Sequence, residues 1–197
     1  MDITIISRPD IFPGEELAIR LLLDNGADYI HIRKPDLKSG SVAALLDKIP
    51  EKYYDRLILN GNFELLADYN LGGAHLNRRN PAPPAGFKGT VGYSCHSLEE
   101  LMSRRDEMDY CLLSPIYDSI SKSGYASAFS HHILADAAAK GIIDSKVIAL
   151  GGITPQRVTA VKSYNFGGFA VLGYIWDSPT LDVIKDKIEL LRKYADR

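Results

Sequence analysis

Apolar and polar positions follow two alternating patterns along the chain, which predict short strands separated by helices. Eight runs rich in β-branched and aromatic residues have the length and the boundaries of strands. They are residues 3–7, 29–33, 56–60, 73–77, 90–94, 109–115, 146–152 and 168–174. Most segments between them repeat apolar residues every three or four positions, as amphipathic helices do. The clearest of these are residues 13–26, 63–70, 97–105, 154–164 and 178–197.

Helix boundaries can be predicted within several of these segments. Ser97 followed by Glu100 is a capping box, which satisfies free N–H groups at the start of a helix. Thr154 provides an N-cap, and Pro155 takes the first helical position. In the last helix one apolar stripe is predicted to face the core, consisting of Leu181, Ile184, Ile188 and Leu191.

The regular alternation of strands and helices predicts an α/β protein with a parallel sheet. Eight such units favour a closed (β/α)₈ TIM barrel, a single domain over residues 1–197. The fourth helix is predicted to be degenerate, because Pro81, Pro83 and Pro84 interrupt it. A doubly wound open sheet is the alternative architecture.

The stretch "RLILNGNFEL", residues 56–65, tests this architecture. An Asn-Gly pair between apolar runs normally predicts a hairpin, but a helical pattern follows here instead of a strand. In a parallel barrel each strand passes to its helix through a loop on the catalytic face. We therefore expect Asn60, Gly61 and Asn62 to lie on that face.

Composition and charge narrow the choice of partners. A net charge of −2 gives no reason to expect nucleic acid or a membrane surface as a partner. No apolar run is long enough to span a bilayer, and the N-terminal residues lack the features of a secretory signal. Cys95 and Cys111 have no metal-type spacing, which predicts reduced thiols in a cytoplasmic protein. Formation of a homo-oligomer is left open.

Glycines at the ends of the last two predicted strands indicate a phosphate site. Gly151 and Gly152 end the seventh strand, and Gly173 lies near the end of the eighth. Barrels often hold a phosphate at this place, because glycine lets backbone N–H groups approach an anion closely. Tight packing at a strand-to-helix turn is the competing explanation, and the presence of two such strand ends favours phosphate.

Two basic residues could serve a second anionic group. Arg33 ends the second strand, and Lys122 lies in the loop after the sixth. Arg33 offers a planar fork of donors that suits a phosphate. An ion pair at the barrel mouth would explain Arg33 as well, and Ser119, Ser121 and Lys122 could form a solvated loop or a lid.

Histidines stand at or near three strand ends, at positions His31, His75 and His96. A zinc site is disfavoured because no carboxylate accompanies them at a strand end. His75 is predicted to be a hydrogen-bonded structural residue. Cys95 and His96 are neighbours on an extended segment and point to opposite faces, so they do not form a nucleophile–base pair.

With these residues at its predicted strand ends, the chain resembles the thiamine phosphate synthase/TenI family along nearly its whole length. The matching stretches are "HIRK", "LILNG", "GAHLN", "GYSCHSLEEL", "SPIYDSISKSG", "VIALGGITPQRV" and "GFAVLGYIWDS". Their order and spacing are far more specific than any single motif. The resemblance implies a (β/α)₈ barrel, in agreement with the periodicity, and a phosphorylated thiazole as the ligand.

In the synthases of this family a pyrimidine pyrophosphate loses pyrophosphate with the help of Mg²⁺, and a thiazole nitrogen attacks the resulting cation. The family pattern Gln-x-Arg-x-Lys reads His31, Arg33 and Pro35 here, so only the arginine matches. Lys34 is one position away from the family lysine and is expected to point the other way.

The family motif Asn-Asp, whose aspartate binds Mg²⁺, reads Asn60-Gly61 here, and a second aspartate corresponds to Asn80. The resemblance therefore implies a degraded metal site, with Mg²⁺ as a cofactor only if the chain is a synthase. The substrate-binding positions that it implies are Arg33, Asn60, Ser94, Ser119, Ser121, Lys122, Gly151, Gly152, Leu172 and Gly173.

The resemblance is closer to the TenI-like branch, which shares "HIR", "NG" and "HSLEE". It implies tautomerisation of a carboxylated thiazole phosphate, a proton transfer that needs no metal. Pro115 stands where that branch has its catalytic histidine. We therefore expect His31 as the general base, with His96 second and Lys122 as a further catalytic residue. A nearby Arg33 is expected to lower the pKa of His31.

Two other functions remain as alternatives to the isomerase. The first is a thiamine phosphate synthase, which would also bind pyrimidine pyrophosphate. The second is a non-catalytic protein that binds thiazole phosphate. An unrelated phosphate-binding barrel isomerase is disfavoured by the full-length order of the motifs.

Overall fold

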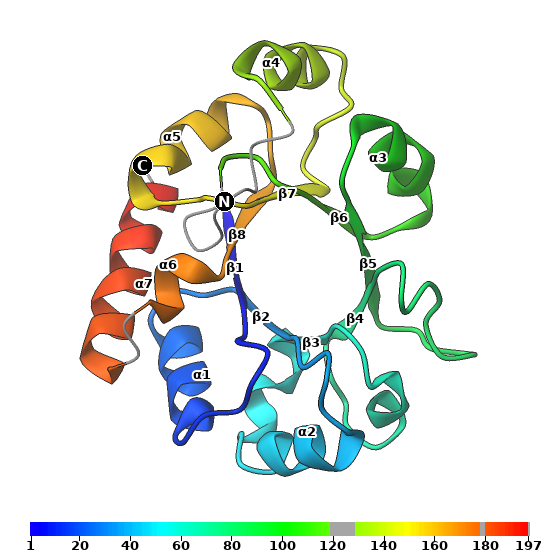
Figure 1. The fold of residues 1–197 in the computed structure, drawn as a ribbon, viewed down its shortest axis with the longest axis vertical. Coiled ribbons are helices and arrows are strands. Elements are labelled where there is room, and N and C mark those ends of the chain that lie inside the picture. The colour runs from blue at the N-terminus through cyan, green and yellow to red at the C-terminus, as the bar shows by residue number, and fades with distance from the viewer. Residues whose placement is uncertain (119–128, 178–179, 197) are drawn as a thin grey trace.

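The computed structural model describes residues 1–118, 129–177 and 180–196. Eight parallel strands form a closed barrel in chain order, with the helices around its outside (Figure 1). The strands are β1 (Asp2–Ile6), β2 (Tyr29–Ile32), β3 (Leu57–Leu59), β4 (Gly73–Leu76), β5 (Thr90–Cys95), β6 (Tyr110–Leu113), β7 (Val147–Leu150) and β8 (Gly168–Val171). Ile5 is paired with Ile30 of β2 and with Val171 of β8, which closes the ring. The predicted TIM barrel is confirmed, and the open sheet is excluded.

Helices follow most of the strands. The α-helices are α1 (Glu15–Asp24), α2 (Ser39–Leu46), α3 (Leu98–Arg104), α4 (His131–Ala139), α5 (Pro155–Ser163), α6 (Gly173–Trp176) and α7 (Leu181–Asp196). The 3₁₀ helices are η1 (Glu51–Arg56), η2 (Phe63–Ala67) and η3 (Arg105–Glu107). Every residue between β4 and β5 is described and none of them is helical, as expected for a degenerate fourth unit.

The turn after β3 explains the Asn-Gly pair. Gly61 has a φ of 146° and Asn62 a φ of 52°, both in the region that favours glycine and asparagine. The chain reverses there and enters η2, a 3₁₀ helix in place of the α-helix that the pattern predicts. The pair therefore serves a strand-to-helix turn and no hairpin.

The apolar stripe of α7 differs from the prediction at its first position. Leu181 is 39% exposed, whereas Ile184, Ile188 and Leu191 are buried as predicted. Ala195 continues the buried stripe at the other end of the helix. Leu181 is the first residue of the helix.

Two apolar layers hold the barrel together. The larger lies between strands and helices, and a small cluster of Ile6, Leu112, Ile148 and Ala170 fills the inside of the ring. The barrel is thus packed with side chains and forms no pore. Within the described part of the chain, no helix has the length and apolarity needed to cross a bilayer.

Candidate functional site

The carboxyl ends of the strands surround a pocket of about 570 Å³. Its apolar floor is formed by Ile6, Leu112 and Leu150, which belong to or pack against the cluster inside the barrel. The rest of its wall comes from the carboxyl ends of β2 to β6 and the loops that follow them, and contains Arg33, Lys34, Pro35, Asn60, Gly61, Asn62, Asn77, Arg78, Arg79, Asn80, Ser94, His96 and Ser114. We call this cavity the mouth pocket. It brings together four of the predicted binding or catalytic residues, namely Arg33, Asn60, Ser94 and His96.

The two basic residues after β2 have different surroundings. Arg33 is exposed at the mouth pocket. Lys34 is buried, and its Nζ lies 2.6 Å from Oε1 of Glu15 while it also donates to two backbone carbonyls. Lys34 also lines the mouth pocket, but its amino group is engaged by Glu15, so it does not replace the family lysine as a free cation. The charge of Lys34 is therefore compensated within the protein.

The residues at the expected metal position do not fit Mg²⁺. A Cβ placed on Gly61 would lie 3.6 Å from Nδ2 of Asn80, so these two positions do face each other. One offers no side chain and the other a neutral amide, whereas Mg²⁺ prefers carboxylate oxygens. Among the described residues no group of three or more His, Cys, Asp or Glu side chains could hold a metal ion.

His96 is fixed at the mouth by the capping box of α3. Ser97 Oγ accepts the N–H of Glu100, and the Glu100 carboxylate accepts the N–H of His96 at 2.8 Å. His96 Nδ1 lies 3.2 Å from the carbonyl oxygen of Ser114, which can only accept. The hydroxyl of Ser114 lies 3.3 Å from the same nitrogen, so Nδ1 can donate to the carbonyl or accept from the hydroxyl.

The glycines after β7, which the sequence predicts to bind phosphate, form a turn with positive φ angles. Gly151 and Gly152 have φ angles of 104° and 63°, so both lie in the region that favours glycine. Gly173 opens α6 directly after Leu172, at the place where barrels use a short extra helix to bind phosphate. Leu172 packs on the apolar cluster that underlies the mouth pocket, which places these strand ends beside it.

Alanine at position 152 is expected to damage this turn more than alanine at position 141. A Cβ on Gly152 would lie 2.8 Å from Cβ of Tyr117 and closer still to the carbonyl of Asp118, whereas Gly141 has a φ of 67° but open space around it. We expect Gly152→Ala to reduce the free energy of unfolding by roughly 1–3 kcal/mol more than Gly141→Ala. Chemical denaturation measures this difference, and equal losses would show that only backbone strain matters.

The prediction that His31 stands at the mouth is wrong. His31 is 1% exposed and lies inside the barrel, where its Nε2 is 3.1 Å from the hydroxyl of Tyr110. That hydroxyl is 3.0 Å from Nδ1 of His75, and Nε2 of His75 is 2.8 Å from Ser94 Oγ. The four side chains form a hydrogen-bonded chain that reaches the mouth pocket only at Ser94. The satisfied, structural role predicted for His75 agrees with these contacts.

The depth of His31 also changes the reason why its pKa is lowered. Burial lowers that pKa to about 3, and Arg33 is not among the causes. Parity along β2 correctly predicts that His31 faces inward, but the ring lies too deep to reach a ligand in the mouth pocket. His96 therefore becomes the histidine that is available there.

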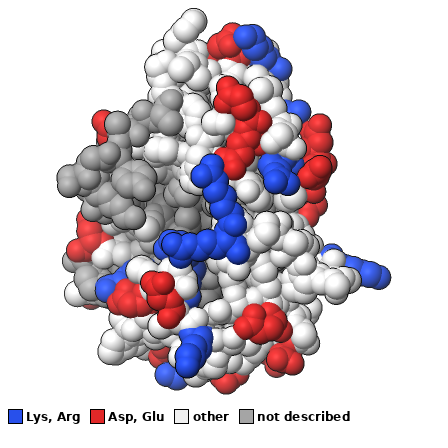
Figure 2. All heavy atoms as spheres, turned by 45° about the vertical axis from the view of Figure 1, so that its right-hand side comes forward, with Lys and Arg blue, Asp and Glu red and all other residues white. Residues whose placement is uncertain are grey.

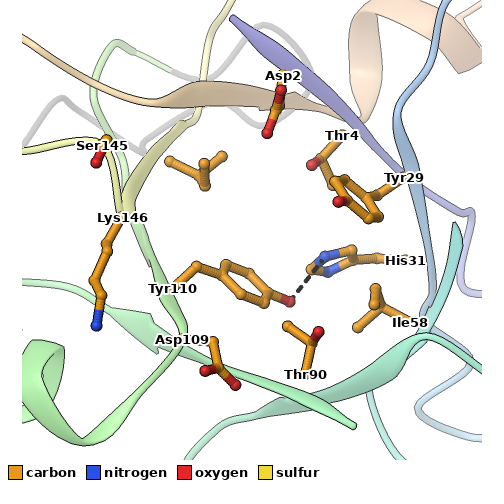
Figure 3. A pocket seen from close by; sticks show the side chains of 11 residues that line it. Asp2, Thr4, Tyr29, His31, Ile58, Thr90, Asp109, Tyr110, Ser145 and Lys146 are labelled. Atoms are coloured by element: carbon orange, nitrogen blue, oxygen red, sulfur yellow. Dashed lines mark hydrogen bonds between the residues drawn. The ribbon is translucent and has the colours of Figure 1, made fainter. Parts of the chain in front are cut away.

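A second cavity, of about 240 Å³, lies at the opposite end of the barrel. Figure 3 shows side chains from the first residues of several strands converging on it, with His31 and Tyr110 pointing toward each other. Its lining includes Asp2, Tyr29 and Lys146. In TIM barrels this end serves stability, while the other end carries the chemistry.

Ser119, Ser121 and Lys122 lie outside the described residues. Arg78, Arg79 and Ser114 line the mouth pocket although the sequence pattern assigns them no role, and Asn62 lines it on the face where the pattern places it. Arg78 and Arg79 could have been predicted from the sequence, because they directly follow the fourth predicted strand.

Comparisons with known proteins identify relatives of the whole barrel. A family model described as thiamine monophosphate synthase matches residues 5–175. The crystal structure of thiamine phosphate pyrophosphorylase from Bacteroides thetaiotaomicron is similar with a TM-score of 0.91 and 36% identity, over 100% of this chain and 98% of that one.

Two proteins named thiamine-phosphate synthase are more distant. The one from Clostridium tetani is 25% identical over 87% of this chain and 86% of its own length. The one from Limosilactobacillus reuteri is 26% identical over 70% of this chain and 66% of its own length. The similarity therefore extends over most of the barrel.

Proposed function

Because this chain belongs to the thiamine monophosphate synthase family, an enzyme family of thiamine biosynthesis, we propose that it joins a pyrimidine pyrophosphate to a thiazole phosphate. The sequence pattern favours the TenI-like isomerase, with the synthase as its alternative. The similar proteins are named as synthases or pyrophosphorylases, which supports the synthase better. The synthase is therefore the first candidate function, and the isomerase is the second.

In the proposed reaction the bond between the pyrimidine methylene carbon and the pyrophosphate oxygen breaks, and pyrophosphate leaves with the electron pair. The thiazole nitrogen then donates its lone pair to that carbon and forms the new C–N bond. The products are thiamine phosphate and pyrophosphate. Charge that develops on the leaving group must be stabilised by fixed positive groups.

The observation that carries the proposal is the charge of the mouth pocket. Arg33, Arg78 and Arg79 line it, and none of its described lining residues is an aspartate or a glutamate. Guanidinium groups suit phosphate oxygens, because their N–H donors are arranged in a planar fork. The glycine turns after β7 and β8 would hold the phosphate of the thiazole beside this pocket, and no step is assigned to Mg²⁺.

A proton-transfer isomerase remains the second candidate, because of His96. Its ring lines the mouth pocket, and its Nδ1 lies within hydrogen-bond distance of both the carbonyl and the hydroxyl of Ser114. Histidine is the side chain most often used for general acid–base catalysis. In this reading His96 takes the role that the sequence pattern gave to His31.

A product assay separates the two functions. Purified protein is incubated with hydroxymethylpyrimidine pyrophosphate and thiazole phosphate, and separately with carboxylated thiazole phosphate. We expect thiamine phosphate and pyrophosphate in equal amounts from the first mixture. Isomer formation in the second mixture alone would overturn the synthase, and binding without any product would indicate a non-catalytic binder.

Two variants complete this assay. Arg33→Ala should reduce synthase turnover by roughly a hundredfold, since hydrogen bonds to charged groups contribute about 1.5–3 kcal/mol. His96→Asn should leave the synthase reaction within about tenfold and abolish the isomerase, for which general base assistance is worth about a hundred- to ten-thousand-fold. An isomerase activity that is lost in His96→Asn, together with no synthase activity that depends on Arg33, would assign the isomerase.

A further inference from the structure

The mouth pocket carries positive charge that the protein does not compensate. Within the described residues Arg33 and Arg79 have no ion pair, and Arg78 makes one contact of 4.0 Å with Glu100 while 78% of its side chain is exposed. Lys34 contributes little, because Glu15 neutralises it. Figure 2 shows Lys and Arg side chains gathered around a hollow on one face of the molecule.

A fixed turn presents two of the three arginines. The side-chain oxygen of Asn77 accepts the backbone N–H of Arg79 at 2.9 Å and that of Asn80 at 3.1 Å. The backbone groups of Asn77 and Asn80 are also hydrogen-bonded to each other, at 3.0 and 3.1 Å. The turn therefore holds Arg78 and Arg79 at the pocket rim, next to the amide of Asn80 that faces Gly61.

The position that would hold a metal ion has thus lost its carboxylates, while guanidinium groups stand beside it. A diphosphate carries several negative charges and needs either a cation or several charge-assisted hydrogen bonds to be bound. Gly61 and Asn80 offer Mg²⁺ no carboxylate. Arginine side chains offer five N–H donors each and keep their charge at any relevant pH.

We propose that the mouth pocket binds a diphosphate group through Arg33, Arg78 and Arg79 without a protein-held divalent cation. The identity of the group rests on the proposed synthase function, whereas the independence from metal rests on the residues of the pocket. Asn60 and Asn62, on either side of Gly61, also line the pocket. Their side chains are neutral amides and add no negative charge.

Calorimetry with inorganic pyrophosphate tests the proposal. We expect binding in the presence of EDTA, and excess Mg²⁺ should change the affinity by less than about tenfold. Arg78→Ala and Arg79→Ala should each weaken binding in EDTA by about tenfold or more. Lys185→Ala is the matched control, because it removes one positive charge from the exposed surface of α7 and should leave the affinity unchanged.

Asn80→Asp provides the reverse test. It returns a carboxylate to the metal position without a change of size, whereas Gly61→Asp would be strained at a φ of 146°. The variant should bind pyrophosphate more weakly in EDTA and regain affinity when Mg²⁺ is added. Wild-type binding that requires Mg²⁺, or arginine variants with unchanged affinity, would overturn the proposal. Because binding is measured without turnover, a failed synthase assay would leave this result standing.

Discussion

Replacing Lys34 by methionine is expected to lower the free energy of unfolding by about 3–5 kcal/mol. The Lys34 and Glu15 side chains are 1% and 0% exposed, and their charged atoms are 2.6 Å apart. Methionine would leave the Glu15 carboxylate buried without its partner, and the second oxygen of that carboxylate already has no hydrogen bond. Urea denaturation of the two proteins measures the loss.

The double variant Lys34→Met/Glu15→Leu shows whether the unpaired charge is the cause. It removes both charges and should recover most of the lost stability, since buried pairs can be replaced by apolar residues at little cost. Lys38→Met is the surface control, because Lys38 is exposed on the same loop. A single variant as stable as the wild type would contradict the buried ion pair.

Acidification below about pH 6.5 is expected to destabilise the barrel through its two interior histidines. Burial lowers the pKa of His31 to about 3, and burial together with the neighbouring His31 lowers the pKa of His75. Between the folded and the unfolded pKa of such a histidine the unfolded chain binds more protons, so stability falls as the pH falls. Each histidine should contribute a slope of up to about 1.4 kcal/mol per pH unit.

Urea denaturation at several pH values from 7 down to about 5 measures this slope. His31→Asn should reduce it by the contribution of one proton, whereas the exposed His132→Asn should leave it unchanged. Carboxyl groups that titrate in the same range contribute equally to these proteins and cancel in the comparison. Identical slopes for the wild type and His31→Asn would show that His31 takes up its proton in the folded barrel as well.

The sequence alone determined the architecture and half of the site. Strand and helix periods are local properties, and eight alternating units have few ways to pack other than a closed parallel barrel. For the same reason the strand ends could be aligned at one face, which predicted Arg33, Asn60, Ser94 and His96 at the mouth. The glycine turn at Gly151 could also be predicted from the strand that precedes it.

The depth of a side chain inside the barrel could not be predicted in this way. Alternation along β2 gives the side on which His31 lies, but the tilt and stagger of the strands decide which layer it occupies. His31 consequently meets Tyr110 and His75 from distant strands, and their enclosure sets its pKa. These partners are remote in the sequence, so no local pattern contains them.

The partners of charged residues were decided by tertiary structure as well. Parity predicts that Lys34 turns away from the pocket, but only the packing of α1 against the barrel brings Glu15 to it. Likewise, the sequence shows only that Arg78 and Arg79 precede three prolines, whereas the Asn77 turn places them at the mouth pocket. A sequence fixes which groups are available and on which side of a strand they lie, whereas distance between remote groups arises only when the barrel closes.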